Sequence, residues 1–354
     1  MKVFFVSEGP NGCGLYRAEI PIRYLPTHGI EARLGHIGST DAEILWADVI
    51  VVQKQYELSF LRRVESFKKR GKKVIYELDD DVFSLPSWNP AHAFYMRIRQ
   101  NVIRYLKAAD AVICSTPFLA QQMRKHNPTV YVCPNSLDFG ELDRMGTAPQ
   151  MISALDRNCN KISTDEFFTR CEGRTVIGWL GSPTHKKDLQ LIVPCLKRIT
   201  RQYGNKVMIV MGGAAHKETV EATSHDQIMF LEMVPPRTYL RYLASLPIDI
   251  GLAPVADHLF NYSKSNLKVI EYMACGFVPV ASNLITYNAT IRDGDNGFLC
   301  RNPAEWIQTV RKLVDNPELR GNVKQNGARY VRARFDIAQV VGTWAGVFKT
   351  VHGG

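Results

Sequence analysis

Short apolar runs alternate with amphipathic stretches along almost the whole chain, and this rhythm restricts the fold more than any other feature. In the first part of the chain, the apolar runs lie at residues 3–7, 47–52, 73–77, 111–114 and 130–132. The stretches between them have helical spacing, and the basic stretch 57–69 ends before Gly71, a typical helix terminator. Because parallel strands require long crossovers, this pattern predicts a parallel sheet with helices on both faces.

A second alternating series begins after a polar stretch, residues 139–172, that lacks the rhythm and contains Gly146 and Pro149. Its apolar runs lie at residues 175–179, 206–211, 228–230, 248–252 and 278–281. Two series predict an α/β protein with two doubly wound, Rossmann-like domains facing a central cleft, and such sheets bind ligands at the carboxyl ends of their strands. The expected limits are a first domain at 1–138, a connecting segment at 139–172, a second domain at 173–330 and a C-terminal helix at 331–354, which we expect to pack back on the first domain.

Length and cysteine usage exclude several classes of protein. A chain of 354 residues is too long for one ordinary domain. No apolar window is long enough for a membrane-spanning helix, and residues 1–6 are too short for the apolar core of a signal peptide. The eight cysteines form no C-x-x-C pair, which is typical of reduced thiols and predicts a cytoplasmic protein.

The net charge of +10 indicates a polyanionic partner, and the excess is at the two ends of the chain. Residues 1–138 contain 18 Lys and Arg against 14 Asp and Glu, and residues 301–354 contain 9 against 4. Basic clusters lie at 62–73 and 320–334. Each is either a solvated helix face or a surface for nucleic-acid phosphates or an anionic membrane.

Residues 261–282 carry the most informative chemistry. Lys264, Lys268 and Glu271 are spaced so that one helix would present all three on one face. Two lysines and a helix N-terminus suit a diphosphate, and a carboxylate one turn later suits a ribose diol. An ordinary charged helix is the alternative.

The segment from Lys268 to Ser282, K-x-x-E-Y-M-A-x-G-x-x-P-V-x-A-S, resembles the nucleotide-sugar signature of the group 1 (family 4-like) glycosyltransferases of GT-B fold. The sequence P-N-S-L-D at 134–138 is similar to their P-N-G-V-D, and 293–299 resembles their G-x-x-G-x-L turn. The resemblance covers nearly the whole chain, and a bacteriophage-type member is one form of it. It implies transfer of a hexosyl or pentosyl group from a nucleoside-diphosphate sugar to an acceptor hydroxyl, with retention of configuration favoured.

The resemblance also implies roles for individual residues. Glu271 would bind the ribose, and the diphosphate would be surrounded by Lys264, Ser265, Asn266 and Lys268. The strand-to-helix turn of the second domain would contribute Gly181, Ser182 and His185. Two family positions differ: Trp179 or Leu180 stands where the family has an arginine, with His185 near its lysine position, and Ser263 replaces the first glutamate of the E-x7-E pair.

Glu77, Asp79, Asp80 and Asp81 crowd together at the end of a first-domain strand. We expect their mutual repulsion to raise at least one pKa, which would make a general base or a cation site. The alternative is that one aspartate caps the next helix and the others are solvated. We favour Asp79 or Asp80 as the group that activates or orients the acceptor, with His185 as a third catalytic candidate.

Further acceptor-side candidates in the first domain are Gly12, Gly14, Arg17 and Asp81. The two glycines would let the loop backbone approach the donor or acceptor closely. No tightly bound cofactor and no metal site are expected, because lysines and helix dipoles neutralise the leaving diphosphate in this fold.

Three functions are compatible with the sequence. Transfer to a glycan or lipid-linked saccharide is slightly favoured, with the protein bound peripherally to the inner face of an anionic membrane. The alternative acceptor is a hydroxymethylated pyrimidine in DNA, flipped out of the duplex and stacked on Trp88 or Tyr95. A non-catalytic nucleotide- or nucleic-acid-binding protein of the same fold is the third reading.

Overall fold

The computed structural model describes residues 1–145, 151–182, 185–213 and 227–354. The chain divides into two compact units, each made of separate chain segments. The first unit comprises Met1–Phe139, His258–Ser265 and Arg334–Gly354, and the second comprises Gly140–Asp257 and Asn266–Ala333. None of the described helices is long and apolar enough to cross a membrane.

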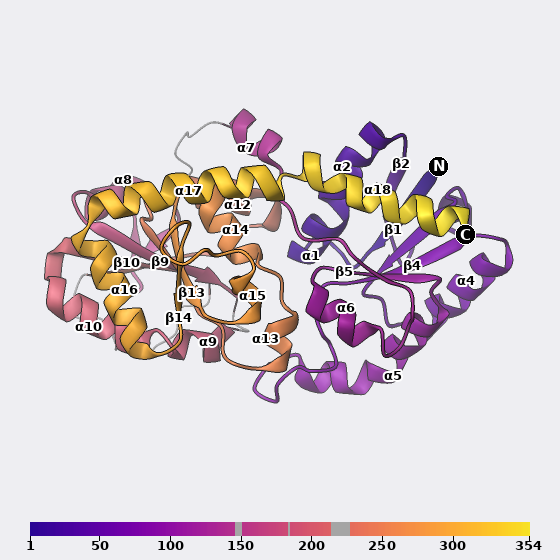
Figure 1. Cartoon of the computed structure of the whole chain (residues 1–354), viewed down its shortest axis with the longest axis horizontal. Coiled ribbons are helices and arrows are strands. Elements are labelled where there is room, and N and C mark those ends of the chain that lie inside the picture. Colours follow the sequence, from indigo (N-terminus) through magenta and orange to yellow (C-terminus); the bar gives the residue numbers. More distant parts are fainter. Residues whose placement is uncertain (146–150, 183–184, 214–226) are drawn as a thin grey trace. The chain divides into compact units, whose positions relative to one another are not determined.

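The first unit contains a six-stranded parallel sheet with the order β2-β1-β3-β4-β5-β6 (Figure 1). Its strands are β1 (Lys2–Ser7), β2 (Glu31–His36), β3 (Val49–Gln53), β4 (Lys73–Leu78), β5 (Ala111–Cys114) and β6 (Val130–Val132). Strands β3 and β5 are fully buried, and β1 and β4 are buried except at their first residue, because helices cover both faces of the sheet. The sequence signal missed β2, since most of its residues are exposed at the sheet edge.

The helices of the first unit connect its strands and include one from the C-terminus. They are α1 (Gly12–Gly14), α2 (Ile20–Tyr24), α3 (Asp41–Leu45), α4 (Leu58–Lys69), α5 (His92–Ala108), α6 (Pro117–Met123), α13 (Leu259–Ser263) and α18 (Ile337–Gly353). The predicted helix 57–69 is confirmed as α4, and Gly71 takes the left-handed φ of +79° behind it. Helix α18 packs against α2 and β3 (Figure 1).

The second unit contains an eight-stranded sheet with the order β14-β13-β12-β9-β10-β11-β7-β8. Its parallel strands are β9 (Thr175–Gly181), β10 (Val207–Gly213), β11 (Ile228–Leu231), β12 (Ile250–Ala253), β13 (Val278–Ser282) and β14 (Phe298–Cys300). The short strands β7 (Ala154–Leu155) and β8 (Lys161–Ile162) add an antiparallel edge. The five strands predicted for this unit are therefore confirmed.

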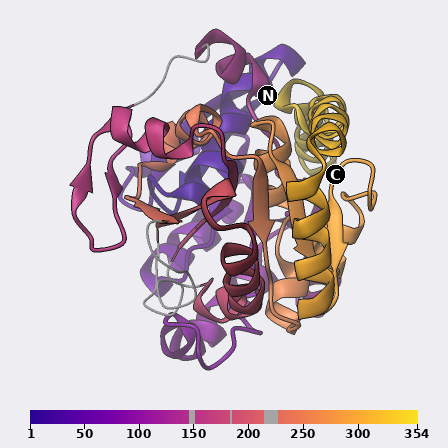
Figure 2. The same ribbon diagram turned by 90° about the vertical axis from the view of Figure 1, so that its left-hand side faces the viewer.

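The helices of the second unit complete its crossovers. They are α7 (Phe139–Met145), α8 (Thr164–Cys171), α9 (Lys186–Gln190), α10 (Val193–Tyr203), α12 (Pro236–Ser245), α14 (Leu267–Ala274), α15 (Ile285–Asn288), α16 (Pro303–Asp315) and α17 (Pro317–Phe335). Helices α10 and α16 pack side by side on one face of the sheet (Figure 2). Between them and the strands lies an apolar core that includes Trp179, Leu196 and Trp306.

The expected connecting segment 139–172 does not behave as a plain linker in its described residues. It forms α7, the β7–β8 hairpin and α8, and β7 pairs with β11 at the sheet edge. An edge hairpin buries little of its surface, so its side chains are largely polar and the sequence shows no apolar run there. Gly146 and Pro149, used to recognise the segment, lie outside the described residues.

The stretch expected as one helix at 331–354 is two helices. Helix α17 ends at Phe335, and Asp336 then caps α18 by accepting a hydrogen bond from the Ala338 amide. The break is also held from outside, since the Leu137 amide donates to the Phe335 carbonyl and the Ile337 amide donates to Leu137. Buried positions recur at helical spacing on both sides of Asp336, so the sequence pattern did not reveal this break.

Candidate functional site

At the carboxyl ends of the first sheet, one lysine stands among three carboxylates. Lys54 follows β3 directly, with a left-handed φ of 48°. Its Nζ lies 3.5 Å from Asp79 Oδ1, 3.4 Å from Asp80 Oδ2 and 3.9 Å from Glu8 Oε2. The side chain of Lys54 is only 10% exposed. These acids therefore share one buried positive charge.

The lysine changes the titration of this cluster. Burial acts to raise the pKa of Asp79, but the Lys54 ammonium and a hydrogen bond from the Cys13 thiol outweigh it, so the pKa lies below its usual value. Burial raises the pKa of Glu8. The expectation of a raised pKa in the Glu77–Asp81 run is met by Glu77, but repulsion is not its main cause, and Asp79 shifts the other way. Asp79 is thus a stable carboxylate, suited to accepting a hydrogen bond.

Arg17 and Glu77 form a fully buried ion pair behind this cluster. Arg17 Nε lies 2.7 Å from Glu77 Oε1, and Nη1 donates to the Cys133 carbonyl and to Asn135 Oδ1. Burial raises the pKa of Glu77 to about 7, although Arg17 opposes the shift. The Arg17 guanidinium also lies 4.8 Å from the Trp344 ring. Arg17 is only 1% exposed, so its contacts are internal to the unit, which does not favour the predicted contact with a phosphate or acceptor.

Asp81 and the two loop glycines also have internal explanations. Asp81 is 2% exposed, and its Oδ1 accepts a hydrogen bond from the Phe83 amide, as in a capped turn. A Cβ on Gly14 would lie 2.0 Å from the Gly9 carbonyl oxygen, so the loop itself requires this glycine. A Cβ on Gly12 would meet nothing within 4 Å. Ligand contact by these three residues stays a prediction.

The same cluster is where the described residues come nearest to a metal-binding arrangement. Ligand atoms of Cys13, Asp79 and Asp80 lie within 4.8 Å of one another. Lys54 already supplies a positive charge to both aspartates. Burial raises the pKa of the Cys13 thiol well above its usual value. The arrangement therefore favours an internal ion-pair cluster.

In the second unit, helix α14 positions Lys268 and Glu271. Lys268 Nζ donates to the Leu180 carbonyl and lies 5.3 Å from the Trp179 ring centre. Glu271 is one turn further along the same helix and is 5% exposed. The predicted pairing of these two residues on one helix is confirmed.

Lys264 and Ser265, in contrast, are not part of that helix. Lys264 is the extended residue that ends α13, so the prediction that it shares a helix face with Lys268 is wrong. The reason is local: a turn at 264–266 separates two short helices. Lys264 and Ser265 belong to the first unit, where Ser265 Oγ accepts a hydrogen bond from Asn135 Nδ2. Asn266 directly precedes α14 in the second unit, and its side-chain amide donates to Thr290 Oγ1.

His185 stands at the start of α9, after the turn that follows β9. Its Nδ1 lies 2.7 Å from Asp188 Oδ2, while Asp188 Oδ1 accepts a hydrogen bond from the Ala256 amide. Asp188 is 5% exposed, so it holds the imidazole ring in a fixed orientation. Asp188 was not predicted from the sequence, although a histidine and an aspartate three residues apart at a helix start were a usable signal.

Glycines end both β9 and β10, so no side chain projects from the backbone at these two strand ends. A Cβ on Gly181 would lie 2.6 Å from the Trp179 ring and 3.3 Å from Lys268 Nζ. Gly213 has φ of +83°, and a Cβ there would lie 2.2 Å from the Gly181 carbonyl oxygen. Ser182, the next predicted residue, follows Gly181 and is partly buried. Side chains at these glycine positions would displace Lys268 and the strand ends.

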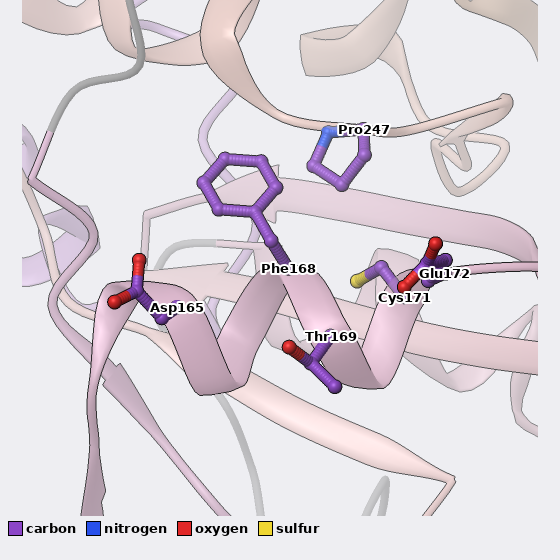
Figure 3. A pocket seen from close by; sticks show the side chains of 6 residues that line it. All are labelled: Asp165, Phe168, Thr169, Cys171, Glu172 and Pro247. Carbon is purple, nitrogen blue, oxygen red and sulfur yellow. The ribbon is translucent and has the colours of Figure 1, made fainter.

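Lys54 is the main site residue that was not predicted from the sequence. A single lysine that directly follows a buried strand, as Lys54 follows β3, was the available signal. A cavity of about 470 Å³ lies elsewhere, on helix α8 of the second unit. Figure 3 shows the Phe168 and Pro247 rings beside it. No predicted site residue lines this cavity, so the candidate site is the set of strand ends and not this hollow.

Comparison with known proteins identifies the second unit most directly. Residues 174–316 match the family model described as "Glycosyl transferases group 1". Over 193 residues the chain is 21% identical to alpha-D-kanosaminyltransferase of Streptomyces kanamyceticus, an alignment that covers 51% of this chain and 47% of that protein. The chain therefore spans about half the length of this curated relative.

Solved structures match over almost the whole chain. Anabaena HepE, crystallised with UDP and glucose, superposes with a TM-score of 0.68 at 14% identity and covers 99% of this chain and 100% of its own. Sucrose-phosphate synthase of Thermosynechococcus elongatus gives a TM-score of 0.67 at 12% identity over 100% and 99% of the two chains. At these identities the likeness establishes the fold, which is GT-B, as the sequence predicted.

Proposed function

We propose that this chain transfers a sugar from a nucleoside-diphosphate sugar to an acceptor hydroxyl, because residues 174–316 match the family model described as "Glycosyl transferases group 1". The observation that carries the proposal is helix α14, inside the matched segment, with Lys268 and a buried Glu271 one turn apart. The fold neighbour HepE was crystallised with UDP and with UDP-glucose, which supports a uridine nucleotide as donor.

Helix α14 offers the groups that a nucleotide sugar needs. The backbone N–H groups at its start and the Lys268 ammonium favour the two phosphates, and Glu271 favours the ribose hydroxyls. Lys264, Ser265 and Asn266 directly precede the helix and would add further diphosphate contacts. Gly181 and Ser182 would let the diphosphate approach the end of β9. His185, oriented by Asp188, would donate to a phosphate oxygen through Nε2 when protonated.

The reaction replaces one bond of the anomeric carbon with another. The acceptor oxygen forms a bond to the anomeric carbon, the bond from that carbon to the diphosphate oxygen breaks, and the acceptor proton leaves with solvent or a carboxylate. Asp79 or Asp80, held by Lys54, would orient the acceptor hydroxyl. Lys268 and the helix N-terminus would stabilise the developing charge on the leaving diphosphate, so no resident metal is required.

We propose retention of configuration and a hexosyl or pentosyl group as the transferred sugar, as in the family that the sequence resembles. A glycan or lipid-linked saccharide is the proposed acceptor, with a hydroxymethylated DNA base as the alternative to test against it. Eight free cysteines, five of them buried, fit the reducing cytoplasm as the place of reaction.

The donor assignment is tested with Lys268→Ala and Glu271→Ala. Each should lower release of UDP from UDP-sugars by about 100-fold, the usual size for loss of a charge-stabilising contact. Lys197→Ala, which removes an exposed lysine from α10, is the matched control and should turn over normally. Unchanged turnover in both site variants would refute the assignment. A panel of saccharide acceptors and hydroxymethylated duplex DNA then separates the two acceptor classes.

A further inference from the structure

A groove with a basic rim lies between α4 and α5 of the first unit. It has a volume of about 550 Å³. Helix α4 contributes Leu58, Leu61, Arg62 and Glu65, and α5 contributes Arg104, Lys107 and Ala108. The groove lies over the two crossover helices of the sheet, and none of the residues assigned above to donor or acceptor lines it.

The two helices carry a strong excess of positive charge. Helix α5 contains Arg97, Arg99, Arg104 and Lys107 and no acidic residue, while α4 contains four basic residues and only Glu65. Two of the α4 cations are used internally, because Arg63 pairs with Asp41 and Lys68 pairs with Asp110.

The three cations that line the groove remain available to a partner. Arg62, Arg104 and Lys107 are exposed, and within the described part of the chain no carboxylate lies within 4.0 Å of them. Arg62, from the basic cluster noted in the sequence at 62–73, shares this groove with two cations from another helix.

Two leucines of α4 also line the groove. Leu58 is 37% exposed at the start of the helix, and Leu61 is 6% exposed. An exposed apolar side chain beside arginine and lysine is typical of surfaces that rest at the boundary between lipid headgroups and acyl chains. A nucleic-acid backbone would use the cations but would gain nothing from Leu58, whereas a lipid bilayer would use both.

We propose that the α4–α5 groove docks the protein on an anionic lipid bilayer, with Arg62, Arg104 and Lys107 on the headgroup phosphates and Leu58 against the acyl region. This docking goes beyond the proposed transfer reaction and does not depend on it. Each cation near an anionic surface contributes additively to partitioning, so the three together dominate the binding.

The test is flotation of the full chain with vesicles of phosphatidylcholine alone and with 30% phosphatidylglycerol added. The protein should float with the anionic vesicles, not the neutral ones, and high salt should release it. The triple variant Arg62→Glu, Arg104→Glu and Lys107→Glu should partition about 100-fold more weakly. Leu58→Ser should weaken partitioning several-fold, because it removes the apolar contact while leaving the charge unchanged.

The matched control reverses three exposed cations on α10 of the second unit, Lys197, Arg198 and Arg201. It makes the same change in net charge and should float like the unaltered protein. Equal loss in both triple variants would overturn the groove and leave only net charge. Groove-dependent binding of duplex DNA without vesicle binding would also overturn the proposal. UDP release, measured in parallel without vesicles, should be unchanged in the groove variants, so that failure of the transfer proposal is recognised separately.

Discussion

The carboxyl ends of the strands carry different kinds of residue in the two sheets. In the first unit, each cation is held by carboxylates: Lys54 stands among three carboxylates, and Arg17 is paired with Glu77 in the interior. In the second unit, Gly181 and Gly213 keep the backbone bare, and Lys268 donates to a main-chain carbonyl.

The difference shows where each unit uses its charge. A cation surrounded by carboxylates is already neutralised, so the first cluster is suited to orienting a neutral hydroxyl group. In the second unit, glycines leave the backbone bare beside Lys268, and bare backbone lets a large anion approach closely. This arrangement fits the proposed diphosphate contact in the second unit. Four substitutions would break or sharpen this comparison.

Arg17→Leu should have the largest effect. It leaves the Glu77 carboxylate buried without its partner, which should lower the free energy of unfolding by about 3–5 kcal/mol in urea denaturation. Arg170→Leu is the control, because Arg170 pairs with Glu166 one helical turn away at the surface and should cost less than about 1 kcal/mol. Equal losses would mean that burial of the Arg17–Glu77 pair does not increase its contribution to the free energy of unfolding.

Glu77 should make stability fall as pH rises. Its folded pKa of about 7 lies above the ordinary value of 4.5, so the folded state binds the extra proton between these limits. The free energy of unfolding should therefore decrease by about 3 kcal/mol from pH 4.5 to pH 7 through this group. Denaturation of Glu77→Gln across the same range should show a flatter profile. An identical slope in both proteins would contradict the assignment.

Lys54→Met should cost about 2 kcal/mol at neutral pH, less than Arg17→Leu because the cluster is partly solvated. Asp79 has a lowered pKa, and this contribution is present above the ordinary pKa of 3.8 and is lost as pH falls through the folded value. The deficit of the variant should shrink on acidification. A pH-independent deficit would indicate lost packing and not lost charge pairing.

Gly213→Ala should cost about 1–3 kcal/mol, because a Cβ would meet the Gly181 carbonyl and the φ of +83° strains alanine. Gly204→Ala separates the two causes: its φ is +51°, but its Cβ would meet nothing within 4 Å. Thermal unfolding should show a smaller loss for Gly204→Ala, about 1 kcal/mol. If the two variants lose equally, backbone strain alone is responsible.

Most of the fold was accessible from the sequence because buried strands are short continuous apolar runs. The strands that the apolar runs predicted are present, and the missed β2 and the β7–β8 hairpin lie at sheet edges, where exposure removes the apolar signal. Helix periodicity likewise could not detect the break at Asp336, because buried positions recur at helical spacing on both sides of it.

The site was predicted less evenly. Lys268 and Glu271 were found because three residues of spacing on a helix is a local property. Lys264 was misplaced onto that helix, since a turn between two short helices leaves no strong mark in the sequence. Lys54 was missed because its partner Asp79 is distant in sequence and meets it only in the folded unit. Asp188 was missed although its partner His185 stands only three residues before it.

The sequence by itself determined the two alternating series, the GT-B fold and the lysine–glutamate helix of the second unit, because each depends on local periodicity or a short motif. Only the tertiary structure decided which charges are neutralised. It placed Lys54 among Glu8, Asp79 and Asp80, and paired Arg17 with Glu77 across 60 positions. The physical reason is that an ionisable group's charge state depends on burial and on neighbours within a few ångströms, and these are fixed only when the strands come together.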